Sequence, residues 1–82
     1  MPKSIGTPEH KLVCKLLRAY RERAGLTQEA LAARLTHQQP FVSKVESGEI
    51  RLDLVQLRAY CLALGTTVTE FVSAFEDELP VV

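Results

Sequence analysis

The sequence is short of cysteine, of long apolar runs and of net charge. Its 82 residues hold two cysteines, Cys14 and Cys61, which form neither a CxxC pair nor a disulfide framework. No apolar run approaches the roughly 20 residues that a membrane-spanning helix needs, and residues 1–6 lack the apolar stretch of a signal peptide. The sequence therefore predicts one small domain over residues 1–82, with no membrane segment, in the cytoplasm, where disulfides are rare.

Patterns typical of catalysis and of metal binding are also missing. No Ser/His/Asp, Cys/His or paired-carboxylate constellation stands out, so an enzyme is the function class that the sequence favours least. His10 and Cys14, spaced i, i+4, share a helix face. A zinc site takes about four ligands, however, and no others cluster in the sequence. We therefore predict no metal and no cofactor.

Zero net charge hides an uneven distribution along the chain. Residues 1–44 carry eight Lys or Arg against three Glu, a net +5, whereas residues 45–82 carry two Arg against seven Asp or Glu, a net −5. A protein without net charge still binds polyanions when one of its faces is basic. The composition therefore leaves nucleic acid open as a partner, and the acidic run at residues 76–78 is interpreted as a solvated end.

Helical spacing and helix caps recur along the chain, and no segment alternates long enough to predict a strand. Four polar residues stand at predicted N-caps: Thr7, Thr27, Asp53 and Thr67. Three glycines stand at predicted helix ends: Gly25, Gly48 and Gly65. Gln56 and Glu70 follow two of these caps at capping-box spacing. The pattern predicts an all-α bundle of five helices, followed by a tail over residues 76–82.

The last two predicted helices carry apolar residues at helical spacing. In the fourth helix, the expected inner face is Leu54, Leu57, Tyr60, Cys61 and Leu64. The fifth helix has more apolar residues than a core needs, and the chain ends in an apolar tail. We therefore predict a self-complementary dimer patch that contains Phe71, Phe75, Leu79 and Val81. The alternative is ordinary core followed by a frayed end.

Residues 27–47 have the layout of two short helices joined by a turn, a helix-turn-helix. The second helix of such a unit lies in the major groove of DNA, so it needs a core face and a polar face. Residues 39–47 provide both, with Val42 and Val45 toward the core. The opposite side carries Gln39, Ser43, Lys44 and Ser47. Gln pairs with adenine and Lys reaches guanine or phosphate; the alternative is a solvated helix face.

The segment GLTQEALA at residues 25–32, followed by QPFVSKVESG at residues 39–48, resembles the phage repressor/Cro-like helix-turn-helix family, often called the XRE regulators. The similarity extends from about Leu12 to Phe75, and the two segments together are specific. The resemblance implies a lambda repressor-like domain of five helices, with the motif at about residues 27–47 and the recognition helix at about residues 39–47. It also implies a bacterial or phage-encoded regulator that binds double-stranded operator DNA as a homodimer.

Matched position by position, the resemblance implies that seven residues meet DNA: Gln28, Gln38, Gln39, Phe41, Ser43, Lys44 and Ser47. Gln28 would contact a phosphate, and Gln39 and Lys44 would reach base edges. The resemblance further implies a structural ion pair between Arg21 and Glu46, which would tie the first helix to the recognition helix.

Three positions near the turn depart from the family pattern. Thr36 replaces the usual glycine, and a residue with a side chain is strained at positive φ. His37 stands where an apolar residue is common. Phe41 stands where a small polar residue usually reads DNA, and its ring either contacts a thymine methyl group or packs inward.

The sequence favours a small transcriptional regulator, a repressor or a controller protein, without a separate effector domain. The main alternative is an antitoxin of the same fold, which binds a toxin partner and regulates its own operon. A helical domain that has lost DNA binding is a weaker alternative, and it predicts no salt-dependent affinity for DNA.

Overall fold

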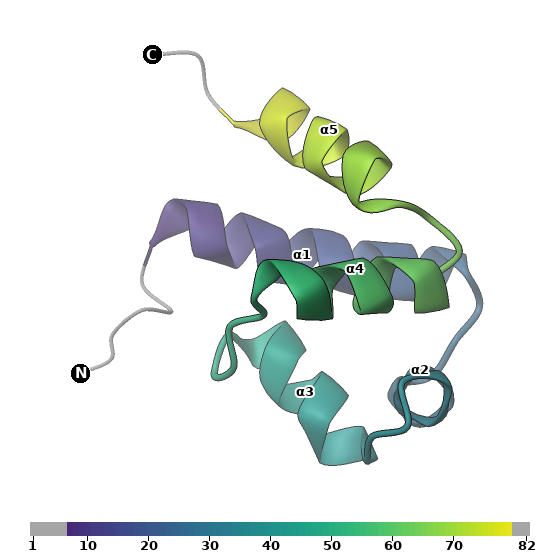
Figure 1. Ribbon diagram of the computed structural model, residues 1–82. Helices are drawn as coiled ribbons and strands as arrows, with labels where there is room; N and C mark the ends of the chain where they lie inside the picture. The colour runs from purple at the N-terminus through teal and green to yellow at the C-terminus, as the bar shows by residue number, and fades with distance from the viewer. Residues whose placement is uncertain (1–6, 80–82) are drawn as a thin grey trace.

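The computed structural model describes residues 7–79, which form five α-helices and, within that range, no β-strand. In chain order these are α1 (Pro8–Arg23), α2 (Gln28–Arg34), α3 (Gln39–Ser47), α4 (Leu54–Ala63) and α5 (Val68–Glu78) (Figure 1). The all-α fold of five helices is therefore confirmed. Within the described range no helix is both long and apolar enough to cross a bilayer.

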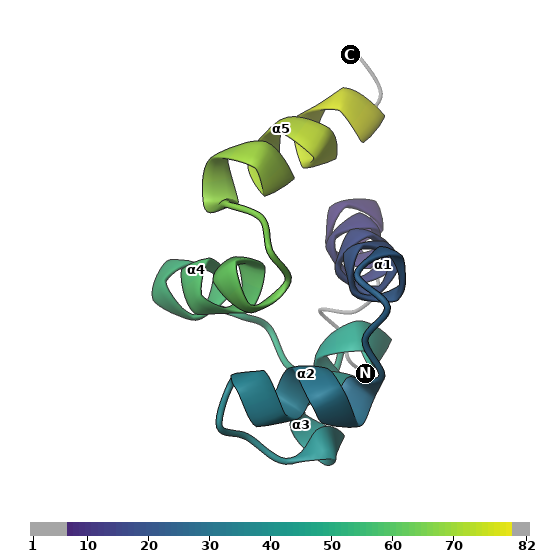
Figure 2. The same cartoon turned by 90° about the vertical axis from the view of Figure 1, so that its right-hand side faces the viewer.

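The helices α2 and α3 lie together at one end of the molecule, and α5 lies at the other (Figures 1 and 2). α2 packs against α3, whereas α4 packs against α5. α1, the longest helix with 16 residues, contacts both α3 and α5. The first helix therefore connects the helix-turn-helix to the opposite end of the molecule.

Local polar contacts fix where four of the helices begin. The side chains of the four predicted caps each accept a hydrogen bond from the backbone N–H three residues further on: Thr7, Thr27, Asp53 and Thr67. The Gln56 side chain also accepts from the Asp53 N–H, which completes a capping box at α4. At α5, Glu70 instead accepts from the Thr66 hydroxyl at 2.9 Å. The prediction of a complete capping box at Thr67 is therefore wrong.

The core lies where all five helices meet. Its most buried large side chains come from every helix: Leu17, Leu31, Val42, Tyr60 and Phe71. Cys61 is also fully buried, as predicted. Leu54, which was predicted to face inward, is 70% exposed. It is the first residue of α4, a helix with apolar residues on several sides, so helical spacing did not single out the buried face.

Candidate nucleic-acid interface

The turn between α2 and α3 has a left-handed residue that is not glycine. Thr36 has a φ of 56°, the one positive φ outside glycine among residues 7–79. The next residue closes α2, because the His37 N–H donates to the Ala32 carbonyl at 2.9 Å. The strain expected for Thr36 is thus present, and the turn still places α3 against α2.

The helix α3, which the sequence predicts as the recognition helix, has the two faces expected of it. Val42 and Val45 are 0% and 2% exposed and lie in the core. The candidate DNA-binding residues lie outside it: Gln38, Lys44 and Ser47 are exposed, and Gln39 and Ser43 are half-buried. Gly48, with a φ of 91°, ends the helix.

Arg21 of α1 and Glu46 of α3 form an almost buried ion pair. The Arg21 Nε donates to Glu46 Oε2 at 2.6 Å, and a second guanidinium nitrogen donates to Oε1 at 3.1 Å. Their side chains are only 10% and 5% exposed. The hydrogen bond to Glu46 raises the pKa of Arg21, against the opposing effect of burial. The third contact, from Arg21 to the Leu26 carbonyl at 2.8 Å, also ties α1 to the residues that precede α2.

Two glutamines extend this ion pair to the surface of the motif. The Gln28 amide donates to Glu46 Oε1 at 3.1 Å, and the Gln39 amide donates to Gln28 Oε1 at 2.7 Å. We call Arg21, Glu46, Gln28 and Gln39 the polar chain. It connects α1, α2 and α3 through side chains alone. Sequence reasoning missed these glutamine contacts, because they depend on the angle between α2 and α3.

Phe41 packs inward, which is one of the two alternatives left by the sequence. Its half-buried ring lies against the core and stacks on His37, with centroids 4.1 Å apart and an interplanar angle of 15°. The ring also lines a small cavity of about 80 Å³ beside Gln56 and Tyr60 of α4. His37 itself is exposed, as expected for a turn residue.

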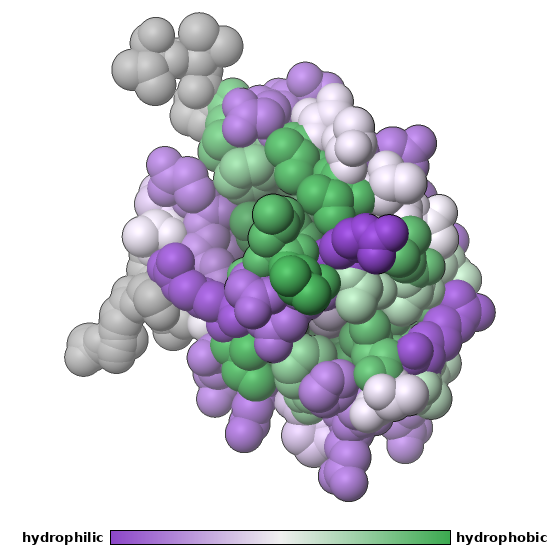
Figure 3. Space-filling view, viewed as in Figure 1, coloured by the Kyte–Doolittle hydropathy of each residue, from purple (hydrophilic) through white to green (hydrophobic). Residues whose placement is uncertain are grey.

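The residues predicted for a dimer patch have different exposures. Phe71 is only 2% exposed and contacts Tyr20, with ring centroids 5.6 Å apart, so it is a core residue rather than an interface residue. Phe75 and Leu79 are half-buried, and Val81 lies outside the described residues. Among residues 7–79, the exposed large apolar side chains are Leu54, Val55, Leu62 and Val72. Figure 3 shows apolar surface over α4 and α5 on one face of the molecule.

The fold and this motif define a helix-turn-helix protein. A family model described as "Helix-turn-helix domain" matches residues 15–73. The control protein C.MunI from Mycoplasma sp. is 33% identical over 64 residues, which cover 78% of this chain and 86% of that protein. The chain therefore belongs to the helix-turn-helix family, as a regulator of the XRE type.

Solved structures agree with this assignment. An XRE-family like protein from Pseudomonas syringae pv. tomato str. DC3000 is 39% identical, with a TM-score of 0.80 over 88% of each chain. The restriction-modification controller protein C.Esp1396I, solved as a tetramer with its natural 35 base-pair operator, has a TM-score of 0.80 at 21% identity. That alignment covers 88% of this chain and 95% of the other, and it shows a shared fold.

Proposed function

We propose that this chain is a cytoplasmic regulator of transcription that binds operator DNA in a sequence-specific manner, with α3 in the major groove. The observation that carries the proposal is the polar chain. It holds Gln39 by a 2.7 Å hydrogen bond at the start of α3, and it is anchored by a buried ion pair in the body of the molecule. A recognition side chain that is fixed before binding loses less conformational entropy on binding.

Gln39 is suited to read adenine. Adenine presents the N7 acceptor and the N6 donor in the major groove, and a Gln side chain pairs with both through one N–H and its carbonyl oxygen. An amide has two N–H donors, and Gln39 uses one of them on Gln28. The second N–H and the carbonyl oxygen remain for the base.

The other polar residues are assigned by their place around α3. Lys44 is exposed on the same helix and reaches guanine or phosphate, with Ser43 beside it. Gln28 lies at the first turn of α2 and contributes its remaining N–H to a phosphate. Gln38 and Ser47, at the two ends of α3, face the sugar-phosphate backbone. Phe41 supports α3 from the core side instead of reading a base.

Two copies of the chain would read two half-sites about one helical turn, or ~34 Å, apart. The apolar surface of α4 and α5 is the face that we assign to this dimer, with Phe75 and Leu79 at its margin. The exposed apolar side chains of α4 and α5 include none of the residues assigned to DNA above, so pairing through them leaves the polar face of α3 in both copies exposed. C.MunI and C.Esp1396I favour a controller protein as the particular kind of regulator. They give no support to a toxin partner.

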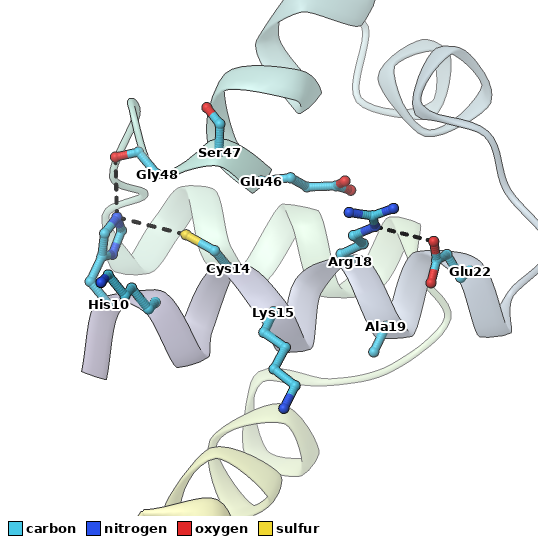
Figure 4. A pocket seen from close by; sticks show the side chains of 10 residues that line it. His10, Cys14, Lys15, Arg18, Ala19, Glu22, Glu46, Ser47 and Gly48 are labelled. Carbon is cyan, nitrogen blue, oxygen red and sulfur yellow. Dashed lines mark hydrogen bonds and ion pairs between the residues drawn. The ribbon is translucent and has the colours of Figure 1, made fainter. Parts of the chain in front are cut away.

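Selection of bound sequences from random DNA, at low and at moderate salt, tests this function. We expect an enriched palindrome with half-sites one turn apart. Gln39→Ala and Lys44→Ala should each weaken operator binding by about tenfold or more, with unchanged helicity. Lys15→Ala is the matched control for Lys44→Ala, because Lys15 points away from α3 (Figure 4). Binding that selects no sequence and vanishes with salt would contradict the proposal.

A further inference from the structure

A groove of about 480 Å³ lies along α1 beside the C-terminal end of α3, and Ser47 is the one residue assigned to DNA above that lines it (Figure 4). Basic residues of α1 line it: Lys11, Lys15 and Arg18. His10 and Cys14 lie at one end of this groove, next to Gly48, the residue that ends the recognition helix. His10 and Cys14 take no part in the function proposed above.

Three donor atoms of different chemistry meet at this end of the groove. The Cys14 sulfur lies 3.8 Å from His10 Nε2, and the same nitrogen lies 3.4 Å from the Gly48 carbonyl oxygen. His10 and Cys14 are one helical turn apart on α1, so the helix itself holds the two side chains together. Cys14 is only 8% exposed, but it lines the groove and is reached from there.

This donor set favours a soft cation that takes few ligands. Thiolate sulfur with imidazole nitrogen suits ions such as Cu(I), whereas hard ions prefer oxygen. With metal bonds to sulfur and to imidazole of about 2.3 and 2.0 Å, the values for zinc, a single ion reaches both donors across 3.8 Å at a bent angle, and the nearly linear geometry of a two-coordinate ion needs the imidazole to move outward by about 0.5 Å. Within residues 7–79 no group of three or more His, Cys, Asp or Glu could hold a metal, which disfavours zinc in its usual four-ligand site.

The positive charge of the groove favours a monovalent cation over a divalent one. Three bases, Lys11, Lys15 and Arg18, and two acids, Glu22 and Glu46, line the groove, so its lining has a net charge of +1 and additional positive charge is unfavourable there. A monovalent cation that replaces the thiol proton adds none, whereas a divalent cation adds one unit. Both acids already have partners: Glu22 pairs with Arg18, and Glu46 accepts hydrogen bonds from Arg21 and Gln28.

The sequence alone predicts no metal at these residues, but from the contacts of His10 with Cys14 and Gly48 we propose that Cys14 and His10 bind one soft monovalent cation of the Cu(I)/Ag(I) class. The Cys14 S–H bond breaks, its proton passes to solvent, and a sulfur–metal bond forms, while the lone pair of His10 Nε2 forms the second bond. No oxidation or reduction takes place. Because Nε2 cannot bind the ion and donate a proton together, the ion takes the imidazole away from the Gly48 carbonyl. Ion binding would therefore remove a contact between α1 and Gly48, the residue that ends α3.

Titration of the reduced full-length chain with Ag(I), in chloride-free buffer with a competing soluble thiol, tests the site. We expect one Ag(I) per chain. His10→Gln, which keeps a polar side chain of similar length, should weaken binding tenfold or more, and Cys14→Ser should abolish it. Cys61→Ala is the matched thiol control, because Cys61 is fully buried outside the groove, and it should bind as the parent does. Circular dichroism verifies that each variant is folded.

A nitrogen-detected NMR spectrum of the parent gives a second test that needs no variant. Ag(I) should shift the Nε2 resonance of His10 and the amide resonances around Gly48. Parent-like affinity in His10→Gln, or an unshifted Nε2 resonance, would overturn the proposal, since the thiol alone would then be the ligand. Equal binding by Cys14→Ser, or loss of the bound ion in Cys61→Ala, would place the ion elsewhere and overturn it as well.

Discussion

Two Arg–Glu pairs in this molecule have similar chemistry and very different surroundings. Arg21 and Glu46 are almost buried and belong to the polar chain. Arg18 and Glu22 lie one turn apart on the outside of α1, with their side chains 65% and 56% exposed. Exposed pairs add little to stability because water and salt screen them, whereas removing one partner of a buried pair leaves a charge without compensation.

Arg21→Ala should therefore lower the free energy of unfolding by about 3 kcal/mol or more, because Glu46 stays buried without its partner. Arg18→Ala is the matched control, and it should change that free energy by no more than about 0.5 kcal/mol. Urea unfolding followed by circular dichroism measures both. If the two substitutions had equal effects, burial of the Arg21–Glu46 pair would make no difference to its contribution to stability.

The Tyr60 hydroxyl is buried, and it has no hydrogen-bond partner among residues 7–79. A buried polar group without a partner costs about 1–3 kcal/mol, so Tyr60→Phe should raise the free energy of unfolding by about 1 kcal/mol. Tyr20→Phe, at a half-buried position on α1, is the control and should change it by less than half as much. Thermal and urea unfolding of both variants test this, and a clear loss of stability in Tyr60→Phe would contradict the structure.

Cys61 makes stability depend on pH in the alkaline range. Burial raises the pKa of its thiol from 9.0 to about 11. Because the folded protein holds the thiol proton more tightly than the unfolded chain does, the contribution of this group to the free energy of unfolding is complete below pH 9. It is lost as pH rises through 11. At pH 11 the loss from this group is about 2 kcal/mol. Urea unfolding at pH 8 and pH 11 should show that the parent loses this much more stability than Cys61→Ala, and equal losses would exclude the thiol as the cause.

At the scale of the elements, the turn before the recognition helix stores strain. Thr36 is β-branched and has a φ of 56°, a conformation that costs an L-residue roughly 1–2 kcal/mol. Glycine removes that cost but makes the unfolded chain more flexible. Thr36→Gly should therefore raise the free energy of unfolding by about 0.5–1 kcal/mol. Thr36→Val, which keeps the branch and loses the hydroxyl, should not stabilise, and urea unfolding distinguishes the two.

Local sequence signals predicted the helices well, and contacts between helices were predicted poorly. A cap such as Asp53 and a terminator such as Gly48 act within a few residues, so the sequence alone locates them. Glu70 turned to Thr66 instead of the expected N–H, because two acceptable partners lie within its reach. The Arg21–Glu46 pair came from the family resemblance and not from spacing.

In the candidate site, too, local features were predicted from the sequence and contacts between helices were not. The face of α3 that carries Lys44 follows from helical periodicity around Val42 and Val45. The hydrogen bond between Gln28 and Gln39 does not, since it depends on how closely α2 and α3 pack. The contact of His10 with the Gly48 carbonyl spans 38 residues, and no local pattern in the sequence indicates it.

At the scale of the whole molecule, two different kinds of surface lie on different helices. The polar chain and the turn shape the end that carries α2 and α3, and exposed apolar residues gather on α4 and α5. Val55 and Leu62 lie two turns apart on one side of α4, and they are 78% and 52% exposed. Apolar side chains this exposed mark an interaction surface when they lie together.

A charge placed on this apolar surface should disrupt dimer formation without changing the face of α3 that is proposed to bind DNA. Leu62→Glu should convert a dimer to a monomer of 9.1 kDa, because a carboxylate cannot be buried without a partner. Affinity for a full operator should fall at least tenfold, whereas affinity for one half-site should hardly change, because α3 is untouched. Lys15→Glu, a charge change of α1 outside this surface, controls for net charge. Sedimentation and DNA titration measure both effects, and a Leu62→Glu variant that remains dimeric would move the interface away from α4.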